Sequence, residues 1–157
     1  MKITFLLNGK TEDEYVEQGC RIYESRLSRY TSYRRVELAS PKVPSGTPPE
    51  GIRVREAEIL LRQLTDEDVV ILLDEKGSSF TSKEFARFLQ QKLNSGIKSL
   101  VFVVGGPFGF DERIYRRSQA QISLSPMTFP HQLVRIIFAE QLYRAFSILR
   151  NEPYHHS

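Results

Sequence analysis

Two runs of consecutive apolar residues constrain the fold of this chain most strongly. Residues 69–73 (V-V-I-L-L) and 100–104 (L-V-F-V-V) contain no polar side chain. A strand without polar–apolar alternation is typical of the interior of a parallel sheet, where helices cover both faces. The first run ends at Asp74 and the second at Gly105-Gly106-Pro107. We therefore expect two central parallel strands, each followed by an irregular loop.

The rest of the chain alternates between strand and helix patterns. Strands are expected over residues 2–8, 34–39 and 122–124, and helices over residues 12–30, 52–64, 82–93, 111–118 and 131–149. Thr11 is expected to cap the first helix with Glu14 as its capping-box partner, and Thr81 or Ser82 to cap the third. Residues 40–51 contain four prolines and two glycines, which predicts a loop. This order predicts an α/β fold, with a mostly parallel sheet flanked by helices, as one domain over residues 1–157.

The composition of the chain excludes several classes of protein. Hydrophobic residues make up 40% and charged residues 26% of the 157 residues, which is ordinary for a globular chain. One cysteine, Cys20, excludes a disulfide framework and a cysteine-built zinc site, and is compatible with a reducing cytoplasm. No signal peptide or membrane span is expected, because no apolar run approaches the required length. A net charge of +3 weakly favours a polyanionic partner.

The loops after the second apolar run and after residues 122–124 are the best candidates for a ligand site. Ligands of open α/β sheets bind at the carboxyl ends of strands. Gly105, Gly106 and Gly109 would let backbone approach a ligand, or would only serve a tight turn. Residues 124–129 (L-S-P-M-T-F) suit a ligand with an apolar ring and hydrogen-bonding edges, or form an apolar helix cap. Phosphate-loop and nucleophile-elbow motifs are absent, and three histidines, two of them adjacent in the tail, do not make a metal site.

Several motifs together carry a family resemblance. They are L-D-x-x-G at residues 73–77, T-S-K-E-F-A at 81–86, V-V-G-G-P-x-G at 103–109, S-L-S-x-M-T-F-P-H-Q-L-V-R at 123–135, E-Q-L-Y-R-A at 140–145 and P-Y-H at 153–155. Over essentially its whole length the chain resembles the ribosomal RNA large subunit methyltransferase H family of the SPOUT superfamily. That family often ends with a basic residue after Tyr-His, whereas this chain has His156-Ser157, which puts a terminal phosphate contact in question.

The resemblance implies a specific activity and architecture. It implies methylation of N3 of a pseudouridine in large-subunit (23S) ribosomal RNA, by a cytoplasmic homodimer whose C-terminal part is threaded into a trefoil knot. It also implies that S-adenosylmethionine is bound in the knotted loops. Carried onto this sequence, the cofactor contacts are Leu73, Gly105, Leu124, Ser125, Pro126, Met127, Thr128 and Phe129. No metal is implied.

Methyl transfer to N3 requires loss of a proton, so a base or a cation that stabilises the anion is expected near the target. The candidates are Arg144, Tyr154 and His155. An ion pair between Glu140 and Arg144 is the structural alternative for Arg144. His131 is expected to be an interior, hydrogen-bonded histidine in the first turn of the last helix.

The apolar last helix and the net charge of the chain lead to expectations about its assembly and its substrate. The last helix is apolar on more than one face, which predicts packing against a symmetric partner. Because a charge of +3 is weak for binding free RNA, we expect a composite site between subunits and an assembled ribosomal particle as substrate.

The main alternative to a methyltransferase is a non-catalytic ribosome- or RNA-binding factor with the same fold. A flavodoxin-like nucleotide-binding module is a weaker one, because the loop after the first strand is too short to cradle phosphate.

Overall fold

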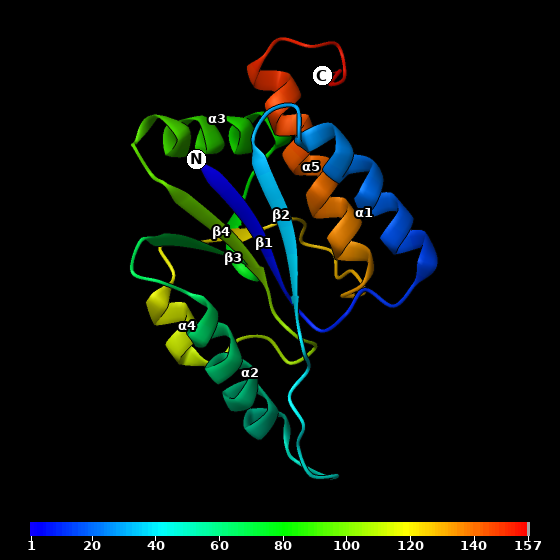
Figure 1. The fold of residues 1–157 in the computed structure, drawn as a ribbon, viewed down its shortest axis with the longest axis vertical. Helices are drawn as coiled ribbons and strands as arrows, with labels where there is room; N and C mark the ends of the chain where they lie inside the picture. Colours follow the sequence, from blue (N-terminus) through cyan, green and yellow to red (C-terminus); the bar gives the residue numbers. More distant parts are fainter. Residues whose placement is uncertain (157) are drawn as a thin grey trace.

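A computed structural model describes residues 1–156 as an alternating series of strands and helices (Figure 1). The elements are β1 Lys2–Asn8, α1 Glu14–Leu27, β2 Ser32–Leu38, α2 Pro49–Gln63, β3 Asp68–Ser79, α3 Ser82–Asn94, β4 Ser99–Val104, α4 Glu112–Arg117, β5 Ala120–Ser123 and α5 Leu133–Leu149. The five strands form one sheet in the order β2-β1-β4-β3-β5, and every pair is parallel. The predicted α/β class with a parallel sheet is therefore confirmed.

Helices cover both faces of the sheet, as the two apolar runs predicted. Alternate side chains of a strand point to opposite faces. Phe5 and Phe102 thus join the core beneath α1, α3 and α5, whereas Leu6 and Val103 join the core beneath α2 and α4. The residues of β4 are all buried, which explains why its sequence contains no polar–apolar alternation.

Because every strand pair is parallel, the carboxyl ends of all five strands point to one edge of the sheet. The connections through α1 and α3 run toward β2 on one face, and those through α2 and α4 run toward β5 on the other. This arrangement is what right-handed crossovers require. In Figure 1 the arrows of β1, β2 and β4 point to the lower part of the molecule, and the C-terminal tail lies at the upper end.

Several predicted helix boundaries are wrong. Thr11 is not the cap of α1, because its hydroxyl accepts hydrogen bonds from Arg35 (3.1 Å) and Arg135 (2.8 Å). The N-cap residue is Asp13, which makes no side-chain capping bond. The expected loop at 40–51 ends earlier, because Pro49 occupies the first turn of α2, where its missing N–H costs no hydrogen bond. Thr81, one of the two residues predicted to cap α3, is its N-cap and forms a capping box with Glu84.

Strand β3 continues beyond the apolar run to Ser79. After an irregularity between Leu73 and Ser78 it pairs with β5 again. At Gly77 a Cβ atom would lie 2.6 Å from the backbone of Gln121, so only glycine permits this approach. A segment that reads as a polar turn in the sequence is thus extended by its contact with β5.

Arg135 is a buried cation that ties the end of β1 to α5. Its side chain is 2% exposed, and its guanidinium donates to the carbonyls of Asn8 (3.0 Å) and Gly9 (3.2 Å) and lies 3.3 Å from the Glu37 carboxylate. Because removal of one member of a buried charged network leaves the others unpaired, we expect Arg135→Ala to lower the free energy of unfolding by about 3 kcal/mol. Denaturant titration measures this change. Arg87→Ala, at an exposed position on α3, is the control, and an equal, small effect of both variants would contradict the assigned role.

Candidate functional site

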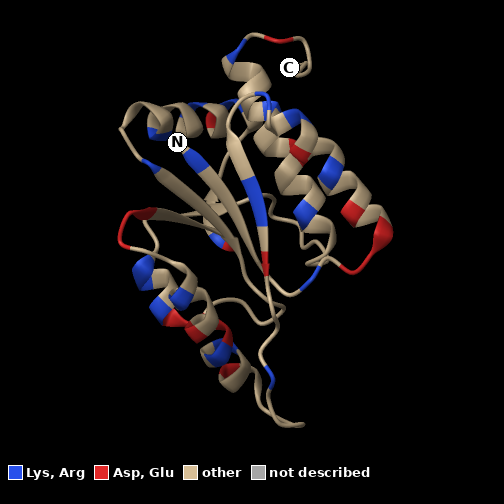
Figure 2. Cartoon of the chain, in the orientation of Figure 1, with Lys and Arg blue, Asp and Glu red and all other residues tan. Residues whose placement is uncertain are grey.

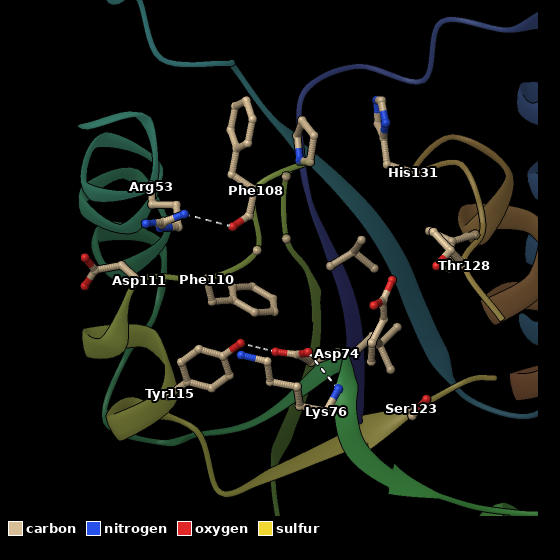
Figure 3. A pocket seen from close by; sticks show the side chains of 18 of the residues that line it. Arg53, Asp74, Lys76, Phe108, Phe110, Asp111, Tyr115, Ser123, Thr128 and His131 are labelled. Carbon is tan, nitrogen blue, oxygen red and sulfur yellow. Dashed lines mark hydrogen bonds between the residues drawn. The ribbon is translucent and has the colours of Figure 1, made fainter. Parts of the chain in front are cut away.

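A large cavity lies at the carboxyl edge of the sheet. It has a volume of about 1400 Å³ and is lined by residues 73–76 within β3, by the ends of β4 and β5 and by the segments that follow these two strands (Figure 3). The lining segments are residues 73–76, 104–113, 123–125 and 127–131, with further residues from α2, α4 and α5. Both loops that the sequence singled out therefore meet at one site.

The glycine-rich loop contains a tight turn, one of the two alternatives that the sequence left open. Gly109 has a φ of +80° and donates to the Gly106 carbonyl (3.1 Å), which closes a tight turn around Pro107 and Phe108. Gly105 does not have a positive φ, so its backbone conformation does not require glycine. A Cβ atom at this position would, however, lie 3.2 Å from the Phe110 ring. The Arg53 guanidinium donates to the Phe108 carbonyl (3.3 Å), and the Phe108 side chain is 43% exposed at the rim of the cavity.

The second loop keeps most of its backbone polar groups free. No backbone–backbone hydrogen bond of the described chain involves residues 125–129. The loop is shaped instead by two serines: the Ser123 hydroxyl donates to the Ser125 carbonyl (2.9 Å), and the Ser125 hydroxyl accepts from the Met127 N–H (2.9 Å). Met127 is 73% exposed, which is unusual for so apolar a side chain. Of the predicted cofactor contacts, only Pro126 is not among the lining residues.

The cavity wall contains a polar contact that the sequence did not reveal. The Tyr115 hydroxyl, from α4, donates to the carboxylate of Asp74, which directly follows the apolar part of β3 (Figure 3). Burial, with a further contribution from this hydrogen bond, raises the pKa of Tyr115, so the phenol stays protonated. Tyr115 also meets Phe110 edge to face, with ring centroids 5.8 Å apart. Asp74 could be suspected from its position after a buried strand, but nothing in the sequence marks Tyr115.

The predicted catalytic residues form a second cluster, at the far end of α5. Arg144 pairs with Glu140 through Nη2 (2.8 Å) and Nε, so the ion pair considered from the sequence is present. The Tyr154 hydroxyl donates to the same Glu140 carboxylate (3.0 Å), and the Tyr154 ring lies 4.7 Å from the guanidinium carbon of Arg144. Arg144 Nη1 lies 3.1 Å from Nδ1 of His155. Since a guanidinium can only donate, Nδ1 of His155 accepts this hydrogen bond.

The two clusters lie apart within one chain. The cavity is at the carboxyl edge of the sheet, whereas residues 154–155 lie with the tail at the opposite end of the molecule (Figure 1). His131 was predicted wrongly: it precedes α5, is exposed and lines the cavity, because the helix begins only at Leu133.

Comparison with known proteins decides the family. Residues 1–155 match a family described as "Predicted SPOUT methyltransferase". The chain belongs to the SPOUT methyltransferase family. Curated relatives named "Ribosomal RNA large subunit methyltransferase H" include those of Flavobacterium johnsoniae (46% identical), Geotalea daltonii (44%) and Christiangramia forsetii (43%). Each alignment covers 99% of this chain and at least 99% of the relative. The family expected from the sequence motifs is confirmed.

Charges around the cavity of this SPOUT methyltransferase are mixed in sign. Figure 2 shows basic and acidic residues interspersed along α2 and α4, which flank it. The Arg113 backbone N–H and then its side chain bind Asp111, which lowers the pKa of that carboxyl group. Arg116 lies 3.9 Å from Glu112. The cavity rim is therefore not a strongly basic surface. Across residues 1–156 there is no helix long and apolar enough to cross a membrane.

Proposed function

We propose that this SPOUT methyltransferase transfers a methyl group from S-adenosylmethionine to N3 of a pseudouridine in large-subunit ribosomal RNA. The observation that carries the proposal is the meeting of Leu73, Gly105 and residues 124–125 and 127–129 at one cavity. These are positions at which the family resemblance implies cofactor contacts. The names of the curated relatives support ribosomal RNA as the class of substrate.

The residues of the cavity fit such a cofactor. Leu73, Leu124, Met127 and Phe129 offer apolar side chains to an adenine ring, and the free backbone groups of residues 125–129 offer hydrogen bonds to its edge. Gly105 and Gly106 bring backbone to the cavity wall without side chains. When bound, S-adenosylmethionine supplies an activated methyl group on a positively charged sulfur. The protein's main task is orientation, which in well-aligned reactions contributes about 7–11 kcal/mol.

The tail cluster would assist loss of the N3 proton. Tyr154 is a poor base, because burial and its hydrogen bond to Glu140 raise its pKa and keep it protonated. Arg144 stays charged, held by Glu140, and its guanidinium can stabilise the negative charge that develops on the pyrimidine. His155, docked on Arg144, would orient that side chain. Arg144, Tyr154 and His155 are thus proposed to act as a unit.

A composite site follows from the separation of the two clusters. Because the tail lies at the far end from the cavity of its own chain, we infer a homodimer in which one subunit's tail approaches the other's cavity. We further propose that the segment after β5 is threaded as a trefoil knot and that the enzyme works in the cytoplasm on assembled ribosomal particles. The net charge is only +3, and the charges around the cavity are of both signs. Both observations favour an assembled ribosomal particle as the substrate, because its surface would add contacts that free RNA lacks.

The proposed dimer requires an apolar contact surface on each subunit. Part of the apolar surface of α5 is already covered, because the helix packs between α1 and α3. Exposed apolar side chains are instead found on neighbouring α1, where Tyr15 and Ile22 are 61% and 52% exposed. We expect the wild type to sediment as a dimer at micromolar concentration and Ile22→Glu to shift it toward monomer. Gln91→Glu, at an exposed position on α3, should leave the dimer intact. A monomeric wild type would refute the composite site.

Transfer of labelled methyl groups tests the function. Purified protein and labelled S-adenosylmethionine are incubated with ribosomal particles that lack the modification, or with protein-free ribosomal RNA. We expect incorporation into the particles and much less into free RNA. Equal incorporation into both would refute the particle requirement. Binding to particles without any incorporation would favour the non-catalytic factor.

A further inference from the structure

Glu56 is a buried carboxylate without a partner. It lies on the face of α2 that packs on the sheet, next to Ala57 and Leu60, and is only 7% exposed. Its Oε1 atom is buried without a hydrogen-bond partner, and no ion pair of Glu56 is found within residues 1–156. Burial raises the pKa of the carboxyl group, and no nearby cation offsets this effect. Such a group is costly to keep in a fold and is commonly functional where it occurs.

The Glu56 carboxylate lies against Gly106, a residue of the cavity wall. A Cβ atom at Gly106 would lie 2.4 Å from Oε2 and 2.9 Å from Oε1, so the carboxylate occupies the space beside the glycine Cα. Gly106 does not have a positive φ, and its backbone conformation therefore does not require glycine. The residue is glycine because Glu56 approaches so closely, and Gly106 also lines the cavity.

The other carboxylates around the cavity are better compensated. Asp74 accepts from Tyr115, Asp111 from Arg113, and Glu112 lies near Arg116. Glu50 and Glu75 are exposed to water, which screens them. Within residues 1–156 no cation pairs with Glu56, and its 7% exposure leaves little water to weaken the field of its ionised form. A cation near the Gly106 wall therefore feels Glu56 more strongly than its distance alone would suggest.

We propose that Glu56 makes the cavity selective for charge, favouring the sulfonium cation of S-adenosylmethionine over the neutral product S-adenosylhomocysteine. The inference rests on the proposed function, because it takes the cavity to be the cofactor site. The bound cation would in turn favour the ionised form of Glu56. Once the methyl group and the positive charge have left, the attraction disappears, which would help the product to dissociate.

The test compares two ligands across two variants. Glu56→Gln keeps the shape of the side chain but removes its charge. Calorimetry at mildly alkaline pH gives the ratio of the dissociation constants of S-adenosylhomocysteine and S-adenosylmethionine. We expect Glu56→Gln to lower this ratio about tenfold. Glu58→Gln, on the same helix and next to Arg55, should leave the ratio unchanged. Because contacts to the methyl group are common to all variants, they cancel in this comparison.

The thermal stability of Glu56→Gln shows whether Glu56 selects ligands by charge or only supports the fold. Removal of an unpartnered buried charge should not destabilise the fold, so Glu56→Gln should unfold at the same temperature as the wild type or higher. An unchanged ratio in the folded variant would overturn the role of Glu56 and leave the proposed function intact. A wild type that binds neither ligand would instead refute the cofactor site itself.

Discussion

Replacement of Gly105 by valine is expected to abolish binding of S-adenosylmethionine. The Cβ alone would lie 3.2 Å from two carbons of the Phe110 ring, and the two further methyl groups must either displace that ring or enter the cavity. Both outcomes disturb the cavity wall, because Gly105 and Phe110 both line it. Calorimetry should therefore show no measurable binding, while circular dichroism shows a folded protein. Gly105→Ala should give an intermediate loss, since one methyl group requires a shift of only a few tenths of an ångström. Unchanged affinity in folded Gly105→Val would exclude this loop as the binding site.

Deletion of residues 154–157 is expected to reduce methyl transfer to ribosomal particles by at least about 100-fold, a loss typical for removal of a charge-stabilising group. Cofactor affinity should not change, because the tail does not line the cavity of its own chain. Arg144→Ala should have a similar effect on turnover. Arg144→Lys should not restore activity fully, because an ammonium group cannot reproduce the two-point contact with Glu140.

Two controls make the tail experiment specific. His156→Ala changes an exposed neighbour and should retain activity. Sedimentation of the deletion variant should show that assembly is unaffected. Full turnover without residues 154–157 would remove Tyr154 and His155 from the site, whereas loss of cofactor binding would mean that the tail supports the fold rather than the chemistry.

The sequence predicted well those features that depend on local pattern. Strand β1 was predicted with its observed bounds, and the two apolar runs correctly marked strands covered on both faces. The loop after β4 and the loop after β5 were identified because glycine and proline interrupt strand patterns, and parallel strands necessarily bring their carboxyl ends to one edge. The resemblance then assigned roles within those loops.

Features that depend on distant contacts were missed. Tyr115 reads as one residue of a short charged helix until α4 places it against Asp74, 41 residues earlier. Thr11 looked like a helix cap because the sequence does not show that Arg35 and Arg135 compete for its hydroxyl. Glu56 falls in an ordinary amphipathic pattern, and only the packing of α2 against the Gly106 loop reveals a buried carboxylate without a partner. In each case long-range packing overrode the local signal.

We propose that this protein places a methyl group on N3 of a pseudouridine in large-subunit ribosomal RNA. Mass spectrometry of ribosomal RNA digests from a deletion strain tests this claim most directly. We expect N3-methylpseudouridine to be absent from the deletion strain, restored by the wild-type protein and not restored by Gly105→Val. A deletion strain that retains the modified nucleotide at its normal level would contradict the account.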